Sequence, residues 1–182
     1  MSFEAAEFFG SALHTFWTSG ARGVPEVEGL VVFAILRATD ADINPLVTWA
    51  RARKANVALA KWSAQLAGCL LGAWAARLLL GPEATCFDSL LIGASKTAGT
   101  EAAATFSVVA AAALGDPLAY AAAAAAVTAV AGKLTGAATS PTRFLAVQLL
   151  GRCGDAWTRG GAYLGGQVAG AALAALVLCF VT

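Results

Sequence analysis

Charged residues are scarce in this sequence. Of its 182 residues, 13% are Asp, Glu, Lys or Arg, which is about half the usual share in a soluble domain. The charges also nearly cancel, leaving a net charge of +1 at pH 7. A nucleic-acid-binding protein needs a concentrated positive surface, so we expect no nucleic-acid partner.

Residue types that build catalytic and metal sites are also few. The sequence has one histidine and four cysteines, and the cysteines share no spacing typical of metal ligands. It has no nucleophile paired with a base and no phosphate-binding loop. We therefore predict no enzymatic activity, no metal and no cofactor. Cys69 and Cys179 lie in apolar segments, whereas Cys86 and Cys153 lie in connecting segments, and a disulfide between the latter two is left open.

Apolar residues dominate what is present. They make up 59% of the chain, and the mean hydropathy is +0.71. They cluster in runs that approach or exceed the roughly 17 to 25 residues of a membrane-spanning helix. Residues 118–131 have no polar face, which argues against a soluble Ala-rich bundle. The first run lacks the basic start of a signal peptide. We predict an integral, multi-pass membrane protein in contact with the lipid bilayer.

The apolar runs divide into long and short segments. Two short helices each follow a polar residue and a proline, Asn44-Pro45 and Ser140-Pro141, which suit the N-cap and first helical position. These short helices are expected at 46–53 and 142–150. Predicted spans are 3–19, 28–39, 57–80, 100–114, 118–134 and 160–181, of which the first two are short.

The chain contains an internal repeat. Three stretches of the first half match stretches of the second: 6–8 with 100–102, 43–50 with 139–146, and 64–68 with 166–170. Each half holds an odd number of spans, so the second half must be inverted in the membrane. We expect one membrane domain over 1–182, with halves at 1–80 and 97–182, and the two proline turns meeting at mid-membrane.

On these residues the chain resembles the major intrinsic protein family, the aquaporins. Two Asn-Pro-Ala signatures of that family look like residues 44–46 and 140–142, and residues 134–144 are similar to its second pore loop. The resemblance covers nearly the whole chain. It implies an all-α membrane protein with an aquaporin-like inverted repeat of six transmembrane helices plus two half-helices. The pore motif would comprise Asn44, Pro45, Leu46, Ser140, Pro141 and Thr142.

The resemblance also assigns a selectivity filter. Arg143 falls where the family places its filter arginine, and Thr128 aligns with the filter histidine of water-selective members. The second span has no clear aromatic residue at its filter position. Small side chains at Thr128 and Ala137 around Arg143 would therefore allow a wider filter than a strict water pore. The alternative for Arg143 is a structural clamp on loop carbonyls.

Other polar residues inside the spans have simpler interpretations. Glu7 and Glu101 occupy equivalent repeat positions and should accept hydrogen bonds from loop N–H groups, with Gln65 and Gln167 supporting the same loops. His14 is expected to pack. Arg37, Arg77 and Lys133 are expected at the membrane interface. Glycines at four-residue spacing suit close helix crossings: Gly68/Gly72, Gly132/Gly136, Gly161/Gly165 and Gly166/Gly170.

Two functions fit these features. The resemblance implies a channel for water or a small neutral solute, in which Asn44 and Ser140 donate hydrogen bonds to the solute as well as capping their helices. The alternative is a non-conducting structural subunit of a larger membrane complex. Leu46, Ser140 and the short first two spans favour it, and Val32 would then face a partner. A homotetramer and a larger complex are both left open.

Overall fold

The structure is a computed structural model that describes residues 1–21, 24–51, 54–82, 93–151 and 159–181. The candidate disulfide between Cys86 and Cys153 lies outside these residues. The described part contains eight helices, six long and two short. They are α1 (Phe3–Ala21), α2 (Pro25–Thr39), α3 (Pro45–Arg51), α4 (Ala55–Leu80), α5 (Ala94–Ala113), α6 (Pro117–Thr135), α7 (Pro141–Gly151) and α8 (Gly160–Val181).

Most helix boundaries follow the sequence prediction, and two do not. α2 begins at Pro25 rather than at residue 28, because a proline at the first helical position starts the helix within the predicted connector. α5 begins at Ala94 rather than at residue 100. Its first turns carry polar residues that suggested a loop, yet Thr97 is only 1% exposed.

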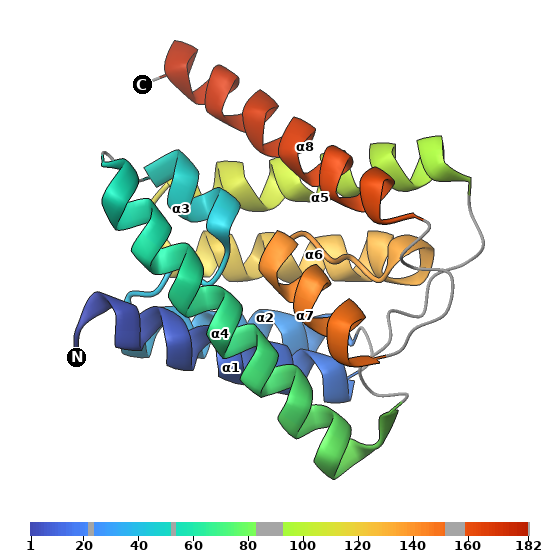
Figure 1. Cartoon of the computed structure of the whole chain (residues 1–182). Helices are drawn as coiled ribbons and strands as arrows, with labels where there is room; N and C mark the ends of the chain where they lie inside the picture. Colours follow the sequence, from blue (N-terminus) through green and yellow to red (C-terminus); the bar gives the residue numbers. More distant parts are fainter. Residues whose placement is uncertain (22–23, 52–53, 83–92, 152–158, 182) are drawn as a thin grey trace.

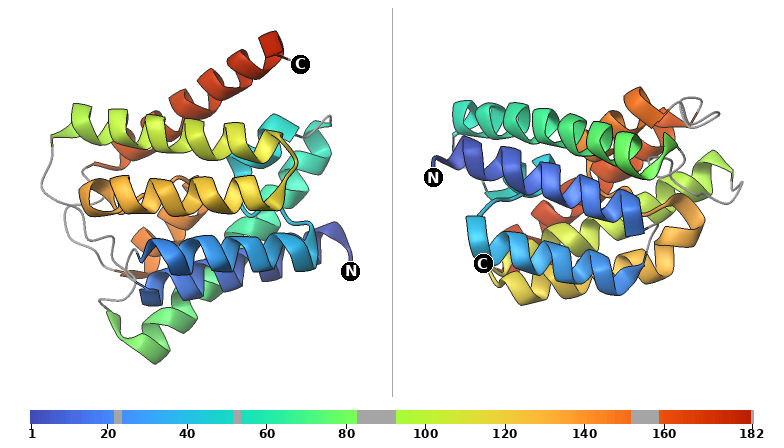
Figure 2. Two further views of the ribbon diagram at one scale, coloured as in Figure 1. Left: turned by 180° about the vertical axis from the view of Figure 1, so that it is seen from behind. Right: turned by 90° about the horizontal axis from the view of Figure 1, so that it is seen from below.

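The two short helices pack against the long ones, α3 against α4, α5 and α8 and α7 against α4. α1 packs against α4, α5 packs against α8, and α2 packs against α6. The start of α1 and the end of α8 lie at the same end of the bundle, on the left in Figure 1. We call this end the terminal side and the other the opposite side. α3 runs from the centre toward the terminal side and α7 toward the opposite side, as expected of an inverted pair (Figures 1 and 2).

Two pairs of glycines allow the closest helix crossings. A Cβ atom on Gly68 of α4 would overlap the carbonyl oxygen of Phe8 on α1, and one on Gly170 of α8 would overlap that of Ala102 on α5. These glycines therefore let backbones touch, as small residues do in membrane bundles. The same holds for the other member of each pair, Gly72 and Gly166.

The Gly161/Gly165 pair does not serve this purpose. A Cβ atom on Gly161 or Gly165 would meet no described atom within 4 Å, so the predicted close crossing there is wrong. Gly136 ends α6 with a φ of 78°, a left-handed conformation that glycine adopts without strain. Four-residue spacing alone does not distinguish these cases, because a close approach of two helix backbones depends on which helix face packs against a neighbouring helix.

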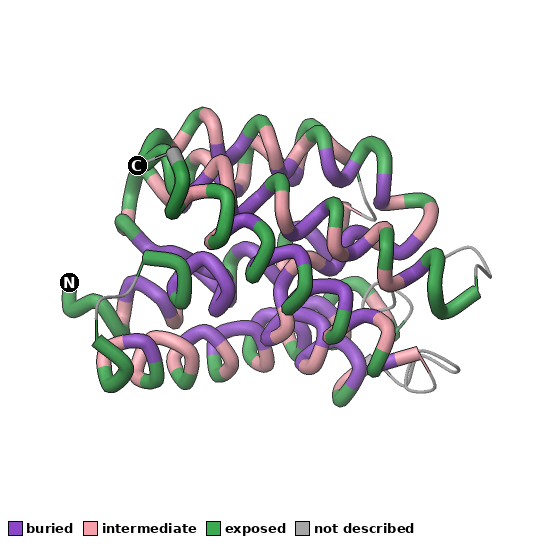
Figure 3. The backbone as a smooth tube through the Cα atoms, turned by 90° about the horizontal axis from the view of Figure 1, so that it is seen from above, coloured by how far each residue is buried: buried purple, intermediate pink, exposed green. Residues whose placement is uncertain are grey.

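The outer surface of the bundle is apolar, as expected of an integral membrane protein. Buried residues lie toward the interior and exposed ones face outward (Figure 3). Large exposed side chains include Leu30, Leu78 and Val130, which are 69%, 66% and 74% exposed. Among the described helices, α4, α6 and α8 are long and apolar enough to cross a membrane. α2 has 15 residues, or roughly 22 Å of helix, against roughly 30 Å of bilayer core.

Candidate functional site

The starts of the two short helices meet at the centre of the bundle. Asn44 Oδ1 accepts a hydrogen bond from the Leu46 N–H at 3.0 Å, which caps α3. Asn44 Nδ2 donates to the carbonyl oxygen of Thr139 at 3.0 Å, one residue before Ser140 and the start of α7. The Ser140 hydroxyl lies 3.1 Å from that of Thr142. Asn44 therefore joins the two loops directly.

The loops that lead into these helices have left-handed backbone at non-glycine residues. Ile43 has a φ of 52°, and Ala137 and Thr139 have φ values of 48° and 46°. This conformation is uncommon for ordinary residues and is unusual for a β-branched one such as Ile43. Each such residue costs on the order of 1–3 kcal/mol and persists where its surroundings hold it. Both loops therefore need strong anchors.

Glu7 anchors the first loop. Its Oε1 accepts a hydrogen bond from the Asp42 N–H at 2.8 Å and its Oε2 accepts one from the Ile43 N–H at 2.9 Å. Gln65 Nε2 donates to Oε2 at 2.8 Å, and Lys61 Nζ lies 3.0 Å from Oε1. Each of these four contacts comes from a hydrogen-bond donor, so the buried carboxylate holds the strained loop against α1 and α4.

Glu101 anchors the second loop in the same way. Its carboxylate accepts hydrogen bonds from the Ala138 N–H at 3.2 Å and from the Thr139 N–H at 3.0 Å. The Thr135 hydroxyl donates at 2.5 Å and Gln167 Nε2 at 3.0 Å. Glu101 has the hydroxyl of Thr135 among its donors, where Glu7 has the charged amine of Lys61.

Asp42 forms a charged cluster that the sequence did not indicate. Its carboxylate accepts from Arg51 at 2.8 Å, from Lys61 at 2.8 Å and from the Thr48 hydroxyl at 3.0 Å. Arg51 comes from α3 and Lys61 from α4, and the fold turns both toward this acid. The cluster ties α3 to α4 on the terminal side.

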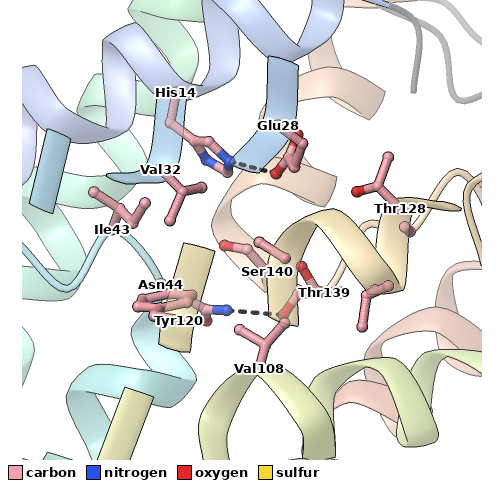
Figure 4. A pocket seen from close by; sticks show the side chains of 13 residues that line it. His14, Glu28, Val32, Ile43, Asn44, Val108, Tyr120, Thr128, Thr139 and Ser140 are labelled. Carbon is pink, nitrogen blue, oxygen red and sulfur yellow. Dashed lines mark hydrogen bonds and ion pairs between the residues drawn. The ribbon is translucent and has the colours of Figure 1, made fainter. Parts of the chain in front are cut away.

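A small cavity with both polar and apolar lining residues, called the polar cavity below, lies beside the meeting point of α3 and α7 (Figure 4). Its volume is about 10 Å³, near the lower limit for holding one water molecule. Its polar lining comes from α1, α2, α6 and both loops, so it brings together residues far apart in sequence. The lining residues are His14, Glu28, Val32, Ile43, Asn44, Val108, Tyr120, Ala124, Val127, Thr128, Ala137, Thr139 and Ser140.

Two of the three residues predicted to form a filter line this cavity, and the third lies near the cavity residue Glu28. Thr128 and Ala137 line it, and Arg143 Nη1 lies 3.7 Å from Glu28 Oε1. His14 Nε2 lies 2.7 Å from the same oxygen, so the expectation that His14 merely packs is wrong. Glu28 was assigned only to the start of an apolar segment. The sequence feature that could have identified Glu28 is a carboxylate inside a span, because such a group usually faces a cavity or a partner.

The third residues of the two pore motifs lie elsewhere. Leu46 and Thr142 line a separate apolar cavity of about 420 Å³, together with Pro45 and Pro141. Neither Leu46 nor Thr142 is among the residues that line the polar cavity. The predicted pore motif is thus divided: Asn44 and Ser140 line the polar cavity, and the next two residues of each motif line the apolar cavity with residues of α4 and α8.

Tyr120 separates the polar cavity from a second polar space on the terminal side. It belongs to the lining of both the 10 Å³ cavity and a neighbouring space of about 30 Å³ that is bordered by Asp40, Arg51 and Asp116. The Tyr120 side chain is buried, and its hydroxyl lies 3.3 Å from the carbonyl oxygen of Asp42. No sequence pattern marks a tyrosine near the start of an Ala-rich span as a residue that lies between two polar spaces.

The three residues expected at the membrane interface differ in their surroundings. Arg37 and Lys133 are exposed near the ends of α2 and α6. Arg77 instead donates a hydrogen bond to the carbonyl oxygen of Leu150. It therefore joins α4 to the end of α7, where unpaired helix carbonyls need donors.

Comparisons with known proteins agree with this architecture. No family model matches the sequence, and no curated protein matches it. Among solved structures, the X-ray structure of the aquaglyceroporin from Plasmodium falciparum superposes with a TM-score of 0.77 at 16% identity, covering 98% of this chain and 93% of that chain. The chain is therefore an all-α integral membrane protein with an aquaporin-like fold.

Proposed function

We propose that this chain is a channel for water or a small neutral solute of similar size. The observation that carries the proposal is the polar cavity beside the paired helix starts. Polar side chains in a membrane interior are costly and mark solute pathways. An amide nitrogen has two N–H groups, so Asn44 can donate to Thr139 and also to a solute. The Ser140 hydroxyl offers a second, shorter-range donor.

The size of the cavity favours water over larger solutes. Its volume of about 10 Å³ compares with the roughly 10–15 Å³ that one water molecule requires. The small side chains at Thr128 and Ala137 suggested a wider filter, but Glu28 and His14 occupy the same region. A single-file path for water-sized molecules is therefore our proposal.

Stopped-flow shrinkage of proteoliposomes tests the proposal. We expect the purified protein to raise osmotic water permeability above that of empty liposomes. Thr128→Phe should abolish the increase, because a ring at this position would fill the cavity. Val130→Phe, on the same helix at a position 74% exposed, is the matched control and should leave the permeability unchanged. Equal permeability for the parent and the Thr128→Phe variant would contradict the proposed path.

A second candidate is a non-conducting subunit of a larger membrane complex. The short α2 and the place of the Tyr120 side chain between the two polar spaces favour it. Val32 was expected to face a partner, but it is 1% exposed and lines the polar cavity. Leu30, 69% exposed on α2, is the better surface position. If Leu30→Arg removes the chain from a native membrane complex and no variant conducts water, the subunit function stands in place of the channel.

A further inference from the structure

The apolar cavity opens on the outer surface of the bundle. Its inner wall includes Pro45, Leu46 and Thr142 at the helix starts, and all three are buried. Its rim carries exposed side chains of α4 and α8, with Leu59 at 59% and Val168 at 55%. Both of these helices are long and apolar enough to cross a membrane, so the rim faces lipid. The cavity therefore leads from the bilayer to the starts of the two short helices.

The polar groups of the lining are directed toward protein partners. The Ser63 hydroxyl donates to a carbonyl oxygen of its own helix at 3.0 Å, and the Thr142 hydroxyl lies 3.1 Å from that of Ser140. Trp62 Nε1 donates to the carbonyl oxygen of Pro45 at 2.9 Å, which holds the indole ring beside the start of α3. The lining thus presents hydrocarbon and ring surface, which suits an apolar ligand.

The size of the cavity suits a chain of carbon atoms. Its volume is about 420 Å³, whereas an apolar cavity of about 150 Å³ in a soluble protein already stays dry and binds small apolar molecules. Inside a bilayer, the apolar molecules that surround a protein are lipids. An acyl chain that enters from the side can therefore fill this space without displacing any hydrogen-bonded water.

Basic residues stand at the terminal-side ends of the two helices beside the cavity. α3 begins in the cavity wall at Pro45 and ends at Arg51, and Lys54 directly precedes α4. Along the helix axes, Arg51 lies roughly 9 Å beyond Pro45, and Lys54 roughly 8 Å before Leu59. Both basic residues are exposed, and the Arg51 side chain is 41% exposed although it pairs with Asp42. Positive charge is thus available where the cavity approaches the membrane surface.

We propose that the apolar cavity binds an acyl chain of one anionic phospholipid, whose headgroup lies at Arg51 and Lys54. Trp49 on α3 is 47% exposed, and tryptophan is enriched at the level of the headgroups. Basic residues at this level attract anionic lipids. The inference goes beyond the proposed channel function and does not depend on it, because the residues of this site are distinct from those that line the polar cavity.

Native mass spectrometry of the delipidated, detergent-solubilised protein measures the binding. The protein is titrated with phosphatidylglycerol, which is anionic, or with phosphatidylcholine of the same acyl chains, which has no net charge. We expect one phosphatidylglycerol to bind at least tenfold more tightly than phosphatidylcholine. Lys54→Gln should weaken the binding of phosphatidylglycerol about fivefold and leave that of phosphatidylcholine unchanged.

A matched pair of substitutions tests the cavity itself. Val168→Trp fills it from the rim and should weaken phosphatidylglycerol binding at least tenfold. Leu173→Trp changes a residue of the same helix that is 53% exposed and is not part of the lining, so it should bind like the parent. If Val168→Trp does not fold, Leu59→Trp fills the cavity from α4, with Leu78→Trp on the same helix as its control.

Three results would overturn the inference. Equal phosphatidylglycerol affinity in the parent and the cavity-filling variant would place the lipid elsewhere. Equal affinity of the parent for the two lipids would remove the headgroup site. Competition by glycerol phosphate, which has the phosphate but no acyl chain, would show that the phosphate alone is bound. Because none of these measurements requires conduction, their outcome is independent of the water permeability that tests the channel.

Discussion

Tyr120 is the residue whose replacement tests the closure of the path most directly. Its side chain lies between spaces of about 10 and 30 Å³. Tyr120→Ala removes the ring and should join the two spaces into one continuous opening toward the terminal side. We expect osmotic water permeability to rise at least tenfold, which corresponds to a barrier lower by about 1.4 kcal/mol.

The conservative variant separates the ring from its hydroxyl. The hydroxyl lies 3.3 Å from the carbonyl oxygen of Asp42, longer than the usual distance for such bonds. A hydrogen bond at the weak end of the usual range contributes about 0.5 kcal/mol. Since about 1.4 kcal/mol corresponds to a tenfold change, this is roughly a twofold change in rate. Tyr120→Phe should therefore alter permeability by no more than about twofold.

The assay is stopped-flow shrinkage of proteoliposomes at matched protein density. Removal of a buried ring costs roughly 3–5 kcal/mol in soluble proteins, so size-exclusion profiles and unfolding temperatures of all variants must first show folded protein. If Tyr120→Phe raises permeability as much as Tyr120→Ala, the hydrogen bond closes the path rather than the ring. If folded Tyr120→Ala protein conducts no better than the parent, Tyr120 does not close the path and the reasoning is refuted.

Three further substitutions test other parts of the structure. Leu46→Ala should leave water permeability within about twofold by the same assay, because Leu46 lines the apolar cavity; a larger rise would place it in the path. Gly170→Val should abolish the yield of monodisperse protein, because its Cβ atom would overlap the Ala102 carbonyl, whereas Gly161→Val should fold normally. Glu101→Gln should lower the unfolding free energy by about 1–3 kcal/mol, measured by thermal unfolding, since its amide would face loop N–H groups; an unchanged midpoint would contradict its anchoring role.

The helices could be predicted from sequence because their signals are local. An apolar run of sufficient length predicts a span, and a polar residue followed by proline marks the start of a short helix. α8 has the predicted bounds, and α3 and α7 begin at the prolines of the two motifs. α2 and α5 begin earlier than predicted. Their first turns are polar, so the apolar pattern did not include them in the helix.

The loop anchors were suggested by the repeat rather than by contacts. Glu7 and Glu101 stand at matching positions relative to the two proline turns, and each carboxylate accepts from two loop N–H groups in the structure. A buried carboxylate near a turn needs hydrogen-bond donors, and the loop N–H groups supply them. The internal repeat therefore predicted the anchoring role of these two residues, which the sequence of one half alone does not indicate.

The sequence by itself determined the helical content, the membrane location and the paired short helices, because these depend on composition and on neighbouring residues. Only the tertiary structure decided what lies in the polar cavity. Glu28 meets Arg143 of a distant helix, and Tyr120 reaches the loop at Asp42. Leu46 turns away from the cavity that its motif borders. These contacts depend on the direction in which each helix face points once the bundle has packed, which no local pattern specifies.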